Sequence, residues 1–490
     1  MKKLAGLLCG LLVLLGAGAQ TPAQQYVYRQ ARSGVLKDAS WGVLALDREG
    51  RILASLNQNQ HLVPASNLKL VTTGTALHYF GPEARLRTQL GYTGEIRDGV
   101  LEGDIYIIGH GDPTLGAKDS IALDSGQLFQ RWKNLLQEAG IHAIHGRIVG
   151  DGSAYEGNLE HQSWAYDDIG TYYGTGTSAL CFYGNALDLA VRAAAPGEPV
   201  QVQQTYPETP WLHLKNLSVT GPDGTGNSLY LYTTDLAPYA ELRGTFATDR
   251  KPKTEHFANK FGALTCAYYF WKNLRESGWD VSGGYADVDR NGSIRSSGFV
   301  AEEKAAEPHV LGETESAPIA AIARITNVRS DNFYAESLLR AMGEDCTGVA
   351  LYDSCLVVQR QVLAALGMPA DGLHQVDGSG LSRMNHVSPE WMVGFLQAMR
   401  QSPAFNAFLA SMPHPGEGTL SALLPNLPGR ERLRIKSGSM DGVLCYSGYI
   451  LAPDGTPAVT LSIMTNNASA SPAEVRVVLA RLLKLLMEEI

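Results

Sequence analysis

The sequence predicts a mixed α/β protein of the α+β type that also carries inserted β-rich segments. Strand patterns near the two ends of the chain, at 41–57 and 433–464, frame several helical patterns. A second set of short strand patterns, separated by Pro and Gly turns, occupies 186–245. The 490 residues suggest roughly three domains, since a domain takes about 150 residues.

The composition excludes several classes of protein. Hydrophobic residues make up 44% of the chain and charged residues 18%, which excludes an intrinsically disordered chain and a coiled coil. The 40 basic and 49 acidic residues give a formal net charge of −9. We therefore expect no nucleic-acid partner, because such partners attract basic surfaces.

Residues 1–19 have the pattern of a secretory signal peptide. Two lysines precede an apolar run, which ends in small residues up to Ala19. This run is too short to span a bilayer, which takes about 20 residues, and no other segment is apolar enough. We predict an exported protein without a transmembrane segment after cleavage near Ala19. A buried N-terminal core helix is the alternative.

The cysteines predict neither a disulfide framework nor a structural zinc site. Without Cys9, which lies in the signal peptide, five cysteines remain, an odd number with no C-x-x-C spacing. Cys346 and Cys355 are close enough along the chain to form a disulfide bond, and five mostly buried thiols are the alternative. His142 and His145 lack a carboxylate partner, so we predict no metal site and no organic cofactor.

The N-terminal half begins with a hairpin and a helix. Apolar residues on both sides of a turn at 47–50 predict the hairpin over 41–57. Pro64 and Ser66 are start signals for the helix, so Ser66 is expected at or near its N-terminus. The patterns then predict short strands over 86–151, the β-rich lobe over 186–245 and a helix over 257–278.

A charged, alanine-rich stretch at 301–307 is interpreted as a linker, after which helices return. The expected elements are helices over 319–325 and 333–342 and consecutive strands over 433–437, 443–451 and 458–464. The last element starts with Ser471, Pro472 and Glu474 in the positions of a capping box. Its apolar face predicts a helix packed on a sheet. A helix on a membrane surface is the alternative, which its few basic residues disfavour.

Three short motifs occur in order along the chain: S-x-x-K at 66–69, S-x-N at 330–332 and K-[ST]-G at 436–438. The first and third patterns occur once each, whereas S-x-N also occurs at Ser55. Each motif alone fits an ordinary helix or strand. The ordered set indicates a serine nucleophile, its base and a substrate-binding strand.

Ser66 and Lys69 have the spacing of a nucleophile and its base. Residues i and i+3 share a helix face, so the Lys69 amine can reach the Ser66 hydroxyl and accept its proton. The amine must be neutral for this, although the ordinary pKa of lysine is about 10.4. Burial beside a second cation lowers such a pKa, and Lys436 is the candidate for that cation. The helix N-terminus adds an N–H for an oxyanion.

The third motif falls on a predicted strand. Leu433, Ile435 and Ser437 alternate with Arg434 and Lys436, as the two faces of a strand require. An edge strand at this position would bind an extended peptide by strand addition.

These motifs resemble those of the class C low-molecular-mass penicillin-binding proteins, the D-alanyl-D-alanine carboxypeptidase/endopeptidases of peptidase family S13. The resemblance covers roughly residues 27–490 and extends beyond the three motifs. It includes the segments at 111–115, 178–180, 376–383 and 418–420, together with Trp164 and Asp168.

The resemblance implies a serine β-lactamase/DD-peptidase fold, in which helices pack on an antiparallel sheet. The long separation between Ser66 and Ser330 agrees with domains inserted between them, as in this family. We expect a discontinuous catalytic domain over 27–92 and 301–490. The inserted part is expected over 93–300, with the β-rich lobe near 186–245 nested in it.

The resemblance also implies a role for each motif residue. Ser66 would be acylated by the penultimate D-Ala of a peptidoglycan stem peptide, with Lys69 as general base and Ser330 as proton relay to the leaving amine. The substrate-binding groups would be Asn332 for the amide, Lys436, Ser437 and Gly438 at the terminal carboxylate, and the N–H groups of Ser66 and Ser439 for the oxyanion. Ser437 stands where threonine is commoner, and its hydroxyl is retained.

The expected protein is a periplasmic serine D-Ala-D-Ala carboxypeptidase that also acts as an endopeptidase on cross-links, with β-lactam antibiotics as inhibitors. A β-lactamase or esterase on the same scaffold is one alternative, which the long insertion and the lack of an evident deacylating Glu motif weaken. A non-catalytic cell-wall-binding protein is another, which the intact motifs weaken. The sequence leaves open the ratio of the two activities, the third residue of the stem peptide and the oligomeric state.

Overall fold

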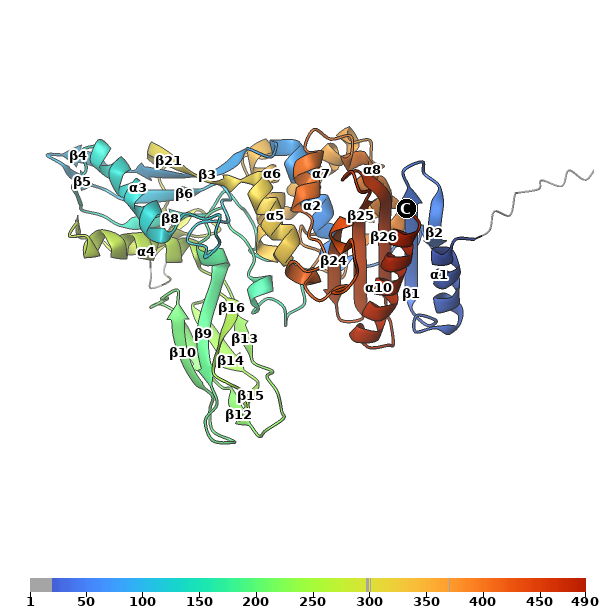
Figure 1. Cartoon of the computed structure of the whole chain (residues 1–490). Helices are drawn as coiled ribbons and strands as arrows, with labels where there is room; N and C mark the ends of the chain where they lie inside the picture. Colours follow the sequence, from blue (N-terminus) through green and yellow to red (C-terminus); the bar gives the residue numbers. More distant parts are fainter. Residues whose placement is uncertain (1–19, 297–298, 300, 370) are drawn as a thin grey trace, which may run out of the picture.

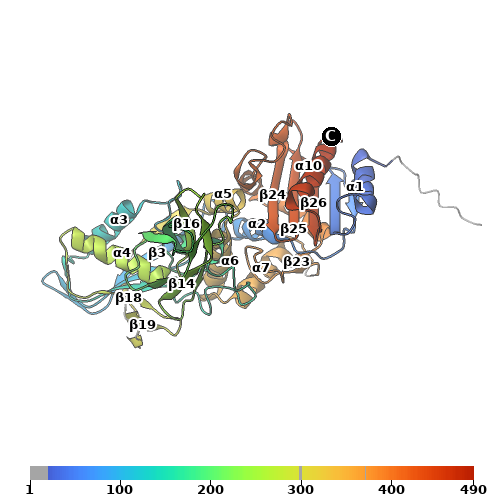
Figure 2. The same cartoon turned by 90° about the horizontal axis from the view of Figure 1, so that it is seen from below.

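The computed structural model describes residues 20–296, 299, 301–369 and 371–490, and the predicted signal peptide lies outside these ranges. Figure 1 shows an elongated molecule with a five-stranded sheet at one end, a seven-stranded sheet at the other and a β-rich lobe between them. The view from below keeps the two sheets at opposite ends (Figure 2). In the ranges described, no helix has the length and apolar character needed to cross a membrane.

The five-stranded sheet is antiparallel and joins the two ends of the chain. In pairing order its strands are β2 (Ile52–Leu56), β1 (Ser40–Asp47), β26 (Pro457–Asn466), β25 (Val443–Leu451) and β24 (Leu433–Met440). Every residue of β25 and β26 is buried because both faces of the sheet are covered. The predicted N-terminal hairpin and the three C-terminal strands are confirmed. β24 is an edge strand.

Helices cover both faces of this sheet. On one face lie α1 (Pro22–Ser33) and α10 (Pro472–Glu488). On the other face are α2 (Lys69–Phe80), α5 (Ile319–Arg329), α6 (Asn332–Thr347), α7 (Tyr352–Ala365), α8 (Pro389–Met399) and α9 (Phe405–Ser411), with the short strands β22 (Leu373–His374) and β23 (His386–Val387). α10 begins with the predicted capping box, and its apolar face packs on the sheet as predicted.

The seven-stranded sheet forms the second core. In pairing order its strands are β20 (Ala301–Lys304), β19 (Ser293–Ser296), β18 (Tyr285–Val288), β8 (Ile148–Asp151), β6 (Ile105–Gly109), β3 (Arg85–Tyr92) and β21 (His309–Pro318). A smaller sheet contains β4 (Glu95–Arg97), β5 (Val100–Glu102), β7 (Ala143–Ile144) and β17 (Asp280–Val281). α3 (Ser125–Glu138) and α4 (Gly262–Glu276) pack on these strands. α4 confirms the predicted helix at 257–278, whereas α3 interrupts what we expected to be a run of strands.

The strand pairing leads us to propose domain boundaries other than those expected at 92/93 and 300/301. β3 pairs with both β6 and β21, so residues 85–92 belong to the seven-stranded sheet. β20 pairs with β19, and the prediction of a linker at 301–307 is therefore wrong. The sequence Ala-Glu-Glu-Lys at 301–304 lacks the alternation of apolar and polar residues by which a strand is predicted, and the pairing of β3 with the distant β21 has no local signal. We propose that the inserted part runs from about residue 82 to 318.

The β-rich lobe projects from the inserted part in Figure 1. Its strands are β9 (Ala186–Arg192), β10 (Gln201–Tyr206), β11 (His213–Asn216), β12 (Val219–Gly221), β13 (Tyr230–Thr233), β14 (Tyr239–Arg243), β15 (Thr245–Ala247) and β16 (Lys253–Ala258). They surround a small apolar core of their own. The lobe thus extends past the expected end at 245, because β16 pairs with β9.

The five cysteines in the described ranges are all free thiols. Cys346 is exposed and the other four are buried. The disulfide bond between Cys346 and Cys355 is not formed, which leaves the alternative of mostly buried thiols. Across the same ranges, no group of three or more His, Cys, Asp or Glu side chains is placed to hold a metal ion.

Candidate active site

The three motifs meet where the first turn of α2 lies between α6 and the edge strand β24. Ser66 lies in a short 3-10 turn, Ala65–Leu68, that continues directly into α2. Lys69 is the first residue of α2 and is completely buried. Its Nζ donates a hydrogen bond to Ser66 Oγ at 3.0 Å. This is the contact that the spacing of the first motif predicts.

The Lys69 amine is held by two further acceptors. Nζ donates to Asn332 Oδ1 at 2.6 Å and to the Ser379 carbonyl oxygen at 2.7 Å. Burial lowers the pKa of Lys69 to about 8, against the opposing charges of Glu336, Asp377 and Asp331. A minor fraction of the amine, about one tenth at pH 7, is therefore neutral and able to accept a proton.

Lys436 and Ser330 form a second pair beside the first. Lys436 Nζ donates to Ser330 Oγ at 2.9 Å and to the Ser437 carbonyl oxygen at 2.6 Å. Ser330 caps the C-terminus of α5 in the left-handed conformation, with φ of 61°. Burial, and then the charge of Lys69, hold the pKa of Lys436 well below its ordinary value. We expected burial and the charge of Lys436 together to lower the pKa of Lys69. Burial is the main cause at both amines, and Lys436 is not among the causes of the shift at Lys69.

Asn332 is hydrogen-bonded on both sides of its amide. Oδ1 accepts from Lys69, and Nδ2 donates to the Tyr173 carbonyl oxygen at 2.9 Å. In this structure the side chain positions the Lys69 amine. Its expected hydrogen bond to a substrate amide stays a prediction. To form that bond, the Asn332 side chain would have to release Lys69 or the Tyr173 carbonyl.

The edge of β24 is open beside Ser66. The Ile435 N–H points away from β25 and donates to the Pro413 carbonyl oxygen at 3.1 Å. N–H directions alternate along a strand, so those of Ser437 and Ser439 point to the same open side. Ser437 Oγ lies 2.8 Å from Thr419 Oγ1. This edge can accept an extended ligand with hydroxyl groups and Lys436 at one end.

Gly438 explains why the third motif needs a glycine. A Cβ atom at this position would lie 2.9 Å from the Asn67 nitrogen and still closer to the Pro64 carbonyl oxygen. Both atoms are backbone, which cannot swing aside as a flexible side chain does. The missing side chain lets β24 approach the turn that carries Ser66.

A buried loop at 377–383 supports the site, and the motifs did not reveal its function. Both carboxylate oxygens of Asp377 are engaged there. The donors are the N–H groups of Gly380 at 2.8 Å and Ser382 at 2.7 Å, the Asn385 amide at 2.8 Å and the Trp164 indole at 2.9 Å. Asp377 therefore fixes the shape of the loop that presents the Ser379 carbonyl to Lys69.

Glu336 holds the same loop from α6. Its carboxylate accepts from the N–H of Gly378 at 2.9 Å and of Ser379 at 2.7 Å. Burial, followed by the charge of Asp377, raises the pKa of Glu336 to about 7. A sequence signal for Glu336 existed, since it follows Asn332 by one helical turn. Asp377, Trp164 and Thr419 lie in segments of the family resemblance, although no chemistry was assigned to them.

Comparison with known proteins identifies the family to which the chain is similar. The model of the "D-Ala-D-Ala carboxypeptidase 3 (S13) family" matches residues 23–486. A D-alanyl-D-alanine carboxypeptidase of Actinomadura sp. (strain R39) is 29% identical over 461 residues, which are 90% of this chain and 80% of the relative. The D-alanyl-D-alanine carboxypeptidase DacB of Haemophilus influenzae is 24% identical over 423 residues, 82% of this chain and 80% of the relative.

Solved structures show the same fold. The crystal structure of penicillin binding protein 4 from Haemophilus influenzae superposes with a TM-score of 0.78 at 23% identity, over 93% of this chain and 98% of that one. The predicted mixed α/β fold, with helices packed on an antiparallel sheet and β-rich insertions, is confirmed. Since the family model covers nearly the whole chain, the protein belongs to the D-Ala-D-Ala carboxypeptidase 3 (S13) family, whose members are serine hydrolases.

Proposed function

We propose that this family member is a serine D-Ala-D-Ala carboxypeptidase that acts on peptidoglycan stem peptides and also cuts D-Ala-containing cross-links. The observation that carries the proposal is the 3.0 Å contact between the buried Lys69 amine and the Ser66 hydroxyl. Lys436 and the open edge of β24 beside this pair supply a place for a peptide with a terminal carboxylate. The export signal expected at 1–19 supports action in the periplasm.

Acylation begins at Ser66. Its Oγ attacks the carbonyl carbon of the penultimate D-Ala while neutral Lys69 accepts the hydroxyl proton. The N–H groups of Ser66 and Ser439 stabilise the oxyanion that forms. Lys436 and Ser437 hold the terminal carboxylate of the substrate.

The C–N bond then breaks and the terminal D-Ala leaves as an amine. Ser330 Oγ accepts a hydrogen bond from Lys436, so the hydrogen of its own hydroxyl is free to pass to the leaving nitrogen. The proton that Lys69 took from Ser66 replaces it, so that Ser330 is again a hydroxyl and Lys69 again neutral. Water next attacks the acyl ester, which releases the shortened peptide and restores Ser66. In a cross-link, the leaving amine belongs to a second stem peptide.

β-Lactams are expected to acylate the same serine. They combine a reactive amide with a nearby carboxylate, and a crystal structure of the Haemophilus influenzae relative contains a β-lactam. Slow hydrolysis of that acyl-enzyme distinguishes a penicillin-binding protein from a β-lactamase.

A labelled penicillin together with a D-Ala release assay tests the proposed function. Wild-type protein should retain the label and release D-Ala from a stem pentapeptide, and Ser66→Ala should do neither. Ser33→Ala, on α1 and remote from the site, should match the wild type. Rapid turnover of the drug would favour the β-lactamase alternative. The absence of both labelling and D-Ala release in the wild type would favour the non-catalytic one.

Gly438→Ala is expected to slow penicillin acylation about a hundredfold, because displacing reacting groups by about 1 Å has that effect. The new Cβ would push β24 away from the turn of Ser66. Gly394→Ala on α8 is the matched control, since its nearest atom would be Met368 Cε at 3.7 Å. Stopped-flow labelling of both variants measures the difference, and equal rates would show that the close approach is not needed.

A further inference from the structure

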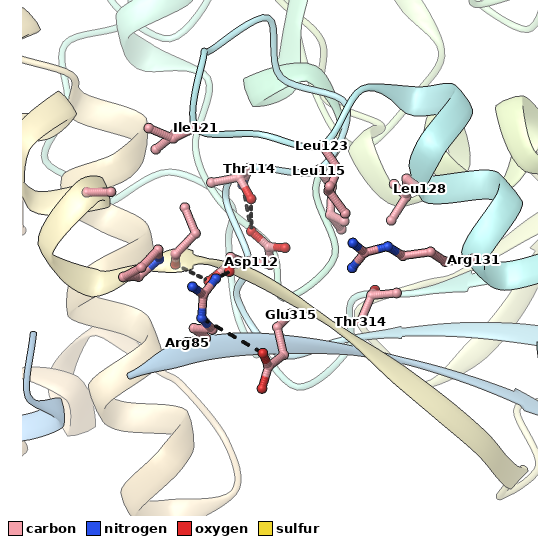
Figure 3. A pocket seen from close by; sticks show the side chains of 14 residues that line it. Arg85, Asp112, Thr114, Leu115, Ile121, Leu123, Leu128, Arg131, Thr314 and Glu315 are labelled. Carbon is pink, nitrogen blue, oxygen red and sulfur yellow. Dashed lines mark hydrogen bonds and ion pairs between the residues drawn. The ribbon is translucent and has the colours of Figure 1, made fainter. Parts of the chain in front are cut away.

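A cavity of about 360 Å³ lies outside the active site, where the inserted part meets α5. Its walls come from the loop after β6, from α3, from the end of β21 and from the first turn of α5 (Figure 3). The volume falls in the range of small-molecule pockets. None of the motif residues lines it.

Asp112 forms part of the cavity wall. The residue is 3% exposed. Its Oδ1 accepts from the Thr114 N–H at 2.7 Å and from Thr114 Oγ1 at 2.6 Å. Among the described residues no donor reaches Oδ2 and no cation pairs with the carboxylate. Burial raises the pKa of Asp112 to about 6, so the group is mostly ionised at neutral pH. A buried carboxylate in this state is stabilised by a positively charged ligand.

Arg131 supplies the opposite charge. It comes from α3, and Figure 3 shows its guanidinium directed into the cavity that Asp112 lines. Within the described ranges Arg131 makes neither a hydrogen bond nor an ion pair, and it does not pair with Asp112. A guanidinium with all its donors free is suited to a carboxylate.

The other charged residues of the cavity neutralise each other. Arg85 Nε lies 3.9 Å from a Glu315 carboxylate oxygen, and Arg85 Nη1 donates to the Ser316 carbonyl oxygen at 2.7 Å. One free negative group and one free positive group therefore remain. A simple anion would be repelled by Asp112, and a simple cation would leave Arg131 unused.

Aliphatic side chains complete the lining. They are Leu115, Ile121, Leu123 and Leu128. We propose that this cavity binds a free amino acid or dipeptide with an aliphatic side chain, whose ammonium group contacts Asp112 and whose carboxylate contacts Arg131. Neither residue takes part in the proposed reaction at Ser66, so binding here is separable from catalysis.

Isothermal titration calorimetry with L-leucine, D-leucine, D-alanine and glycyl-leucine tests the site. We expect binding of at least one of them to wild-type protein at millimolar concentrations or below. Asp112→Asn and Arg131→Gln should each weaken it about tenfold or more, since each removes a charge-assisted contact. Ser437→Ala, which alters the carboxylate site beside Ser66, should leave the affinity unchanged.

Ligands in which either the carboxylate or the ammonium group is chemically blocked show which protein residue binds each end of the amino acid. Leucine methyl ester keeps only the ammonium, so its binding should be sensitive to Asp112→Asn and insensitive to Arg131→Gln. N-Acetylleucine keeps only the carboxylate and should show the reverse pattern. Arg131 is exposed and makes no hydrogen bond or ion pair with the described residues, so its variant remains informative if Asp112→Asn fails to fold. Absence of binding by the whole panel, or binding that neither variant changes, would overturn the proposal.

Discussion

Replacement of Lys69 by methionine is expected to lower the rate constant for acylation of Ser66 by about 10³-fold, the size of effect that a general base supplies. Methionine fills the buried space and cannot accept the proton of the serine. The measurement is the second-order rate constant for labelling by a fluorescent penicillin. Lys484→Met, on α10 and far from the site, should label at the wild-type rate. A Lys69→Met rate within tenfold of the wild type would place the base elsewhere.

The wild-type pH profile provides a second measurement of the same group. The neutral amine is the active form, and burial lowers its pKa to about 8. Acylation should therefore rise as the pH passes upward through 8 and level off above it. About one tenth of the amine is neutral at pH 7, so a roughly tenfold rise to the plateau is expected. A rate that stays flat between pH 6 and 9 would contradict Lys69 as the titrating base.

Asp377→Asn is expected to lower the free energy of unfolding by about 3 kcal/mol and to slow acylation. The two oxygens of Asp377 accept four hydrogen bonds in a buried loop. An asparagine turns one of those acceptors into a donor, which then faces other donors. The loop would loosen, and with it the Ser379 carbonyl that holds Lys69.

Chemical denaturation measures the stability change. Asp371→Asn is the matched control, because this exposed residue makes no side-chain hydrogen bond in the described ranges. It should unfold like the wild type and be acylated at the same rate. A stability loss confined to Asp377→Asn with unchanged acylation would separate the loop from the function of Lys69.

The prediction from sequence was most accurate where neighbouring residues decide the structure. The helix start at Ser66, the capping box at Ser471 and the three C-terminal strands follow from local patterns, and all three are present. The prediction failed at β20, read as a linker, and at α3, read within a run of strands. A short strand such as β20 is stabilised by the strand beside it, and its own sequence carries little of that information.

In the candidate site, too, contacts between neighbouring residues could be predicted from the sequence, whereas contacts between distant segments could not. The spacing of Ser66 and Lys69 places their contact within one turn of the chain, so it could be foreseen. The hydrogen bonds between Glu336 and the loop of Asp377 became visible only in the folded chain, since α6 and this loop are distant in the sequence. The lowering of the Lys69 pKa by burial was expected, whereas the contribution expected from the charge of Lys436 is not found.

By itself the sequence predicted the proposed nucleophile and its neighbouring amine, the order of the motifs and the strand that carries Lys436. These depend on helical and strand periodicity, which act over a few residues. Tertiary structure decided which distant groups surround the amine and how fully water is excluded from it. It also decided that Asp112 and Arg131, which form no ion pair with the described residues, line one cavity. Such features arise when segments far apart in the chain pack together, and local sequence patterns do not specify that packing.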